Sequence, residues 1–225
     1  SPSSSPPASS LSPLESTMKR VEAIFRSRLF VPSTLTFKIT RSDYTCLKVF
    51  RLAARLGGRH LRELRLDGSD YGLTTSICDL SLCSRLEILN LRACRGLKDI
   101  SILEECRFIK ELELNSETLE DISPLSCLTQ LRKLTLTCPR LKQLNLKVIS
   151  KLHSLQELSI RHNSHVEHLD FLLGLRDLKK LELTFLSSLH DATSLNTLPQ
   201  LSKLKVLGCS RVVITNKLPV TNHDY

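Results

Sequence analysis

The sequence has no tryptophan, a single methionine and few aromatic residues, which make up 4% of its 225 positions. A compact globule normally uses aromatic bulk to fill irregular space, so a core dominated by leucine predicts a regular, repeating interior. The chain is long enough to bury such a core without disulfides or metal. It contains no apolar run of about 18 residues, the length that would span a membrane. The absence of an Asn-x-Ser/Thr glycosylation site favours an intracellular address.

Motifs for catalysis are also missing. The seven glycines form no Gly-x-Gly pair, and the chain has neither a nucleophile elbow nor a His-Glu zinc motif. His162, His165 and His168 are the densest group of potential metal ligands, but Val166 between them must point into the core. The three imidazoles should then be scattered around one turn. We therefore expect no enzyme activity, no metal and no cofactor.

The part of the chain after residue 34 repeats the pattern L-x-x-L-x-L. Seven clear copies, spaced 22 to 25 residues apart, begin at Leu61, Leu86, Ile109, Leu131, Leu155, Leu178 and Leu201. A degenerate copy precedes them at residues 35–39. The first half of each copy alternates like a strand, and the second half has apolar residues about every third position, which favours a 3₁₀ turn or short return. Stacking such coils predicts a solenoid over residues 34–214, followed by a tail over residues 215–225.

The copies resemble the leucine-rich repeat family. The run Leu119-Glu-Asp-Ile-Ser-Pro-Leu125 is similar to its short-repeat subclass, which includes the bacterial internalins and the nuclear regulatory subunit of protein phosphatase 1. The segment Leu91-Arg-Ala-Cys94, followed by Leu97-Lys-Asp-Ile100, is similar to repeats of kinetoplastid parasites. The resemblance implies an α/β solenoid, a horseshoe or arc with one short parallel strand per repeat and 3₁₀ or short helical returns. This fold is a scaffold and implies no single biochemical role.

Four of the eight cysteines have structural roles assigned by the repeat register. Cys83 and Cys106 stand three residues before a strand motif, in a slot that other repeats fill with leucine, and should pack as small apolar groups. Cys94 and Cys209 stand three residues after the last strand leucine, where Asn163 stands in its own repeat and where the resembling family uses Asn or Cys to bond backbone. Buried free thiols favour a reducing compartment, cytoplasmic or nuclear, with a mitochondrial address as the alternative.

The charge of the chain is uneven. Residues 1–60 hold ten Lys/Arg and three Asp/Glu, whereas residues 61–225 hold 22 and 20. Residues 1–17 are rich in Ser and Pro, which predicts disorder. Residues 18–33 predict a basic amphipathic helix, either a cap on the solenoid end or a targeting segment, which would resemble a mitochondrial presequence if translation began at Met18. Its candidate contacts to an anionic partner are Lys19, Arg20, Arg26 and Arg28; a solvated basic face without a specific partner is the alternative.

The strands offer the main candidate binding surface. Positions three, five and seven of each motif point away from the core because strand side chains alternate. Their mixture of charges predicts a non-catalytic protein-interaction scaffold that holds a protein partner, or a multi-subunit complex, on its concave strand face. The candidate contacts are Arg65, Arg92, Glu113, Lys133, Arg161, Lys180, Glu182, Lys203 and Lys205.

Two further expectations concern the ends of the chain. The alternative function is a structural subunit of a ribonucleoprotein assembly, a mitochondrial one included, docked through the basic leader with RNA contacts in residues 18–60. At the other end, no amphipathic helix follows the final repeat. We therefore expect an uncovered strand edge there, which would require a partner or further chain.

Overall fold

The structure is a computed structural model that describes residues 33–39, 58–68, 75–212 and 220–224. The chain divides into two compact units, residues 1–31 and 32–225, and every described residue belongs to the second unit. The expected disordered tail over residues 1–17 lies outside the described residues. So does the expected basic helix over residues 18–33, apart from its last residue.

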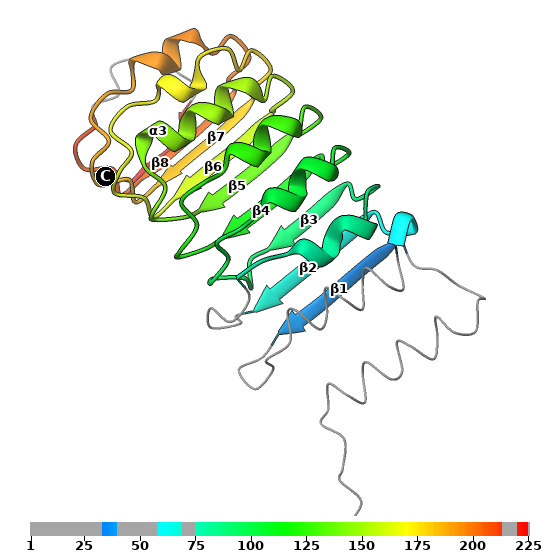
Figure 1. Cartoon of the computed structure of the whole chain (residues 1–225). Helices are drawn as coiled ribbons and strands as arrows, with labels where there is room; N and C mark the ends of the chain where they lie inside the picture. The colour runs from blue at the N-terminus through cyan, green and yellow to red at the C-terminus, as the bar shows by residue number, and fades with distance from the viewer. Residues whose placement is uncertain (1–32, 40–57, 69–74, 213–219, 225) are drawn as a thin grey trace, which may run out of the picture. The chain divides into compact units, whose positions relative to one another are not determined.

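The described residues form one sheet of nine short strands, each paired in parallel with the next along the chain. The strands are β1 (Thr34–Ile39), β2 (Glu63–Gly68), β3 (Ile88–Leu91), β4 (Glu111–Asn115), β5 (Lys133–Thr137), β6 (Glu157–Arg161), β7 (Lys180–Thr184), β8 (Lys203–Leu207) and β9 (Val220–Asp224). Figure 1 shows β1 to β8 side by side in sequence order. Parallel neighbours need a crossover connection, so each strand and its return form one coil of a solenoid.

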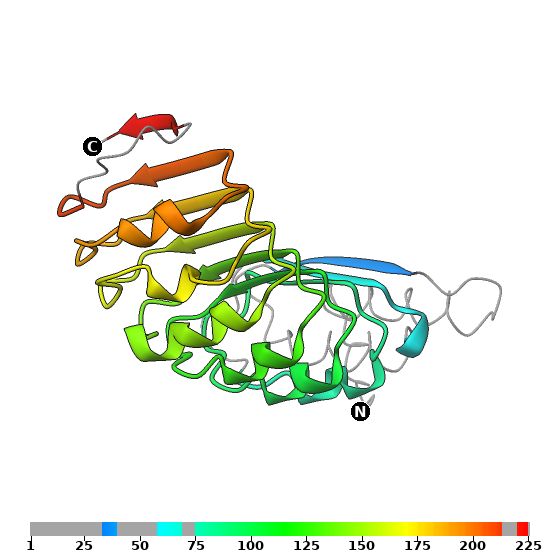
Figure 2. The same cartoon turned by 90° about the horizontal axis from the view of Figure 1, so that it is seen from above.

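The returns between the strands are mostly single 3₁₀ turns. They are η1 (Gly58–His60), η2 (Cys78–Leu82), η3 (Ser101–Glu105), η4 (Ser123–Cys127), η5 (Lys147–Lys151), η6 (Asp170–Leu172) and η7 (Thr193–Thr197), with one α-helical turn, α3 (Gln143–Leu146), before η5. Three residues per turn match the apolar spacing of three in the sequence. Within this unit the strands lie on the inner side of the curve and the returns on the outer side (Figure 2). The predicted solenoid fold is confirmed.

The core lies between the strands and the returns and is built from the repeated leucines. In β4, Leu112 and Leu114 are buried, whereas Glu111, Glu113 and Asn115 are only partly buried on the other face. This alternation is the one that the sequence pattern predicts. Cys83 and Cys106 are fully buried in the same core, which confirms that they fill leucine slots.

A buried asparagine closes the turn after β6. The Asn163 side-chain amide donates hydrogen bonds to the backbone oxygens of Cys138 (2.9 Å) and Leu141 (2.8 Å) in the preceding repeat. Its carbonyl oxygen accepts a bond of 2.7 Å from the backbone N–H of His165. Ser116 serves the third repeat in a similar way, with its hydroxyl donating to the Leu97 oxygen at 2.6 Å. These side chains bond to backbone groups of the preceding repeat and so join neighbouring coils.

The C-terminal end differs from the expected tail. Val220–Asp224 form β9, which pairs with β8 through Leu204 and Val220 and again through Val206 and His223. Within the expected tail over residues 215–225, the five described residues therefore form a strand, and β8 is not an uncovered edge. The physical reason is that sheet hydrogen bonds join backbone groups, so a strand can form without the leucine pattern.

Candidate partner-binding face

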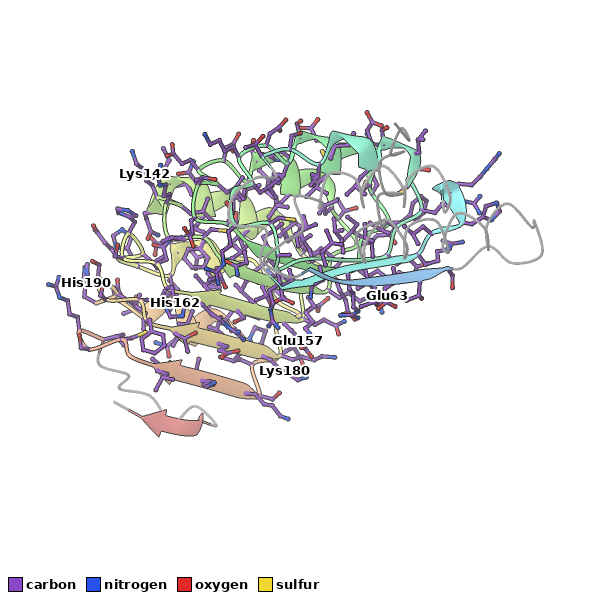
Figure 3. All side chains as sticks on the ribbon, turned by 90° about the horizontal axis from the view of Figure 1, so that it is seen from below. Glu63, Lys142, Glu157, His162, Lys180 and His190 are labelled. Atoms are coloured by element: carbon purple, nitrogen blue, oxygen red, sulfur yellow. The ribbon has the colours of Figure 1, made fainter. Side chains whose placement is uncertain are left out.

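A shallow hollow of about 370 Å³ lies on the strand face over β5 to β8. Five cationic and two anionic side chains line it, so its net charge is +3: Lys133, Arg161, Lys180, Lys203 and Lys205, with Glu157 and Glu182. Figure 3 shows Glu157 and Lys180 on the strand side of the molecule and Lys142 on the side of the returns. The sheet thus concentrates positive charge on one section of its inner face, although the repeats as a whole are nearly neutral.

Glu182 is the centre of the ion-pair network in this hollow. Arg161 lies 2.8 Å from one carboxylate oxygen of Glu182, and Lys205 lies 3.0 Å from the other. Ser159 accepts a hydrogen bond of 2.9 Å from Arg161 and donates one of 3.3 Å to Glu182. Partial burial alone would raise the pKa of Glu182, but these hydrogen bonds and cations outweigh it and lower that pKa. The carboxylate therefore stays charged and fixes the two cations in place.

A second row of charges crosses the same strands at position three of the motif. Over β5 to β8 this row is Lys133, Glu157, Lys180 and Lys203 in that order, and Glu111 on β4 is the register partner of Lys133 on its other side. The two middle members form an ion pair with each other. Within the described part of the chain, the side chains of the outer two, Lys133 and Lys203, make no hydrogen bond or ion pair. This row therefore has an unpaired cation at each end.

The N-terminal part of the strand face is more nearly neutral. Glu113 accepts a hydrogen bond of 2.8 Å from Asn90 and lies 3.0 Å from Arg92. Arg65 pairs with Glu63 on its own strand. The hollow over these strands is only about 40 Å³. This section presents paired charges and little concave space.

Some outward positions are less exposed than the sequence pattern suggests. Asn90, Ser159 and Thr184 are each at least nine-tenths buried. Asn90 and Ser159 are covered because neighbouring charged side chains bond to them. The hydroxyl of Thr184 is the single buried side-chain polar atom among the described residues that lacks a hydrogen-bond partner. The charged side chains thus lie over a layer of small polar residues.

The structure brings together most of the predicted contact residues. Six of the nine line the larger hollow: Lys133, Arg161, Lys180, Glu182, Lys203 and Lys205. Arg65 and Glu113 line the smaller hollow, and Arg92 pairs with Glu113. Glu157 was not among the predicted contacts, although it stands one repeat before Lys180 at the same motif position. Its position in the motif is visible in the sequence, but its pairing with Lys180 is not.

The predicted contacts of the basic leader lie outside the described residues, and the RNA-binding alternative stays a prediction. They are Lys19, Arg20, Arg26 and Arg28.

The described residues offer no group of three His, Cys, Asp or Glu side chains placed to hold a metal ion. The histidines of the candidate cluster make separate contacts. His162 stacks on Phe185, with ring centroids 4.8 Å apart, and His168 meets His190 edge to face at 5.9 Å. In the same part of the chain, no helix is long and apolar enough to cross a membrane.

Comparison with known proteins supports the fold. No protein-family model matches the sequence, and no curated protein is similar enough to count as a relative. Among solved structures, internalin C2 of Listeria monocytogenes is 27% identical, with a TM-score of 0.57 and 74% of each chain covered. A second internalin of that species is 20% identical, with a TM-score of 0.52; the match covers 76% of this chain and 65% of that one.

A leucine-rich repeat protein of Leptospira interrogans has a TM-score of 0.60 at 16% identity. The match covers 86% of this chain but only 50% of the Leptospira chain, so the solenoid spans about half of that protein. Likeness at this level of identity concerns the fold, which is a scaffold for many functions. The chain therefore has a leucine-rich repeat fold, and internalins are among its structural neighbours.

Proposed function

We propose that this protein is a non-catalytic scaffold that holds a protein partner, or a subunit of a larger complex, on its concave strand face. The observation that carries the proposal is the hollow over β5 to β8, which seven charged side chains line. Regular solenoids of this type use their extended concave surfaces for binding.

The charged side chains of the face are partly fixed before any partner arrives. Glu182 holds Arg161 and Lys205, and Glu113 holds Arg92. Side chains that are already ordered lose less conformational entropy when they bind. Charges in fixed positions also select a partner of complementary pattern and exclude others. This surface therefore suits specific recognition.

Replacing Arg92, Glu113 and Arg161 together by alanine should abolish capture of the native partner. The triple variant removes two ion pairs and the hydrogen bond from Asn90 to Glu113. Because exposed ion pairs contribute only about 0–1 kcal/mol each, the fold should survive. The measurement is affinity purification from native extract with quantitative mass spectrometry, with circular dichroism as the check on folding.

A matched control changes the same number of cations and anions on the outer returns. Glu105, Lys147 and Lys151 are exposed in η3 and η5, and their replacement by alanine should leave capture unchanged. If the strand-face variant recovers the same partners as the wild type, the concave face is not the binding surface. Loss of capture in the control variant alone would assign binding to the returns.

We also propose a reducing intracellular compartment, cytoplasmic or nuclear, with a mitochondrial address as the alternative. Burial raises the pKa of the Cys83 thiol to about 11 and that of Cys138 to about 12. Cys106 is also raised to about 12, by burial first and then by nearby Cys83 and Glu105. Such thiols are inert in the fold and carry no disulfide.

Alkylation of the native protein at pH 8 should label Cys83, Cys106 and Cys138 at least about a hundredfold more slowly than partly exposed Cys127. Peptide mapping by mass spectrometry gives the rate at each site, and labelling in urea is the control. Equal alkylation rates at Cys127 and Cys138 in the native protein would contradict the burial of Cys138 in the core.

We also propose two closer family relationships for the repeats. The run from Leu119 to Leu125 supports the short-repeat type shared with the phosphatase regulatory subunit. The segment from Leu91 to Ile100 supports kinship with kinetoplastid repeats.

A further inference from the structure

The two unpaired lysines at the ends of the position-three row carry an inference about the partner's chemistry. Lys133 on β5 and Lys203 on β8 are exposed, and the ion pair of Glu157 with Lys180 lies between them in the row. An unpaired ammonium group offers three hydrogen-bond donors and a full charge. Both lysines also line the hollow with a net charge of +3. The row therefore presents two separate anion-binding points.

The separation of these two points matches an extended polypeptide. Lys133 and Lys203 are three strand spacings apart, and neighbouring strands lie about 4.8 Å apart, which gives about 14 Å. An extended chain rises about 3.3 Å per residue, and its alternate side chains point to the same face. Residues i and i+4 of such a chain therefore lie on one face about 13 Å apart. An extended segment laid across the strands could place one side chain on each lysine.

The anions between the cations limit what kind of partner fits. Glu157 and Glu182 are both part of the hollow, so a ligand with closely spaced negative charges would meet carboxylates as well as amines. Among the described residues that line the hollow, none has an aromatic side chain on which bases could stack. A polyphosphate backbone is therefore a poor match. A peptide with two separated carboxylates is a better one, because it leaves the internal ion pairs intact.

We propose that the strand face over β5 to β8 binds an extended acidic segment of a partner protein, with carboxylates at positions i and i+4 paired to Lys133 and Lys203. This inference rests on the proposed function, since it assumes that the strand face is the binding surface. It adds the chemical class of the partner segment, its path across the strands and the spacing of its charges.

An array of synthetic peptides, probed with the full-length protein, tests the spacing of the two carboxylates directly. Decapeptides of Ser, Thr and Val would carry two Asp residues separated by one to six positions, so that composition and charge are constant. Binding by the wild-type protein should be strongest at a separation of four. The double variant Lys133→Ser/Lys203→Ser should lower that signal about tenfold, as expected for the loss of two surface charge pairs. The control Lys142→Ser/Lys147→Ser removes two exposed lysines of the return side and should change nothing.

Charge reversal provides a second, independent readout. The variant Lys133→Glu/Lys203→Glu should lose the Asp peptides and gain peptides with two Lys at the same separation of four. Binding that depends on total charge but not on separation would overturn the proposal. The proposal would also be overturned if a uridine oligonucleotide bound more tightly than the Asp peptides and the variant Lys133→Ser/Lys203→Ser lost that binding. Such a result would assign the two lysines to nucleic acid.

The outcomes separate this inference from the proposed function. One outcome is that no acidic peptide binds, but the triple variant of Arg92, Glu113 and Arg161 still loses its native partner. The strand face is then the binding surface, and the proposal that it binds an acidic segment is wrong. If the triple variant keeps its partner and no peptide binds, both proposals fail together.

Discussion

Replacing Leu134 by alanine is expected to lower the free energy of unfolding by about 3 kcal/mol. Leu134 is fully buried in β5, in the middle of the sheet, and its register partners Leu112 and Leu158 are also buried. Truncation leaves a cavity between three stacked repeats, which rigid strands on either side cannot close. Urea unfolding followed by circular dichroism, with the transition midpoint and slope both fitted, measures the loss.

The control for this variant is a leucine of the same size outside the core. Leu144 lies in α3 and is 70% exposed, so Leu144→Ala should change the free energy of unfolding by less than about 0.5 kcal/mol. Equal losses in the two variants would mean that leucine content, and not the repeat register, determines stability.

Replacing Asn163 by alanine should cost about 2 to 4 kcal/mol. The side chain is 1% exposed and makes three hydrogen bonds, two of them to carbonyl oxygens of the preceding repeat. Without it, the Leu141 carbonyl loses its side-chain partner, the Cys138 carbonyl keeps only the bond from the Leu141 N–H, and the His165 N–H loses its acceptor. The measurement is again the free energy of unfolding in urea.

A graded series makes the Asn163 prediction sharper. Asn163→Cys should lose less stability than Asn163→Ala. Cys209 fills the same position in its own repeat, and its thiol lies 3.8 Å from the Leu183 oxygen of the preceding repeat. Asn196→Ala, at an exposed position in η7, is the matched control and should be nearly neutral. The hydrogen-bond explanation fails if alanine and cysteine at residue 163 give the same stability.

Most of the fold could be predicted from the sequence because each core position carries its own local signal. Leu112 and Leu114 are leucines at fixed spacing, and burial follows from that spacing alone. Cys83 and Cys106 were recognisable in the same way, by register. Strand β9 was not, because its pairing with β8 depends on backbone groups that every residue carries.

The candidate binding face was less predictable because its side-chain contacts run across repeats. Glu157 and Lys180 are 23 residues apart in sequence but are register partners in the sheet. Spacing places Glu157 at position three of its motif, but it does not show which neighbouring lysine the carboxylate pairs with. The pairing of Glu182 with two cations depends also on side-chain conformation, which repeat spacing does not encode.

The bonding between neighbouring coils has a consequence for how the array opens. The hydrogen bonds of Asn163, the ion pairs of Glu182 and the sheet ladder each join a repeat only to the one beside it. Opening free energies should therefore decrease from the central repeats toward the ends, and amide hydrogens of β5 should exchange more slowly than those of β8. A partner that spans β5 to β8 would bridge four coils at once. Among these four strands, its largest effect on amide exchange should then appear at β8, which lies nearest the end of the described sheet.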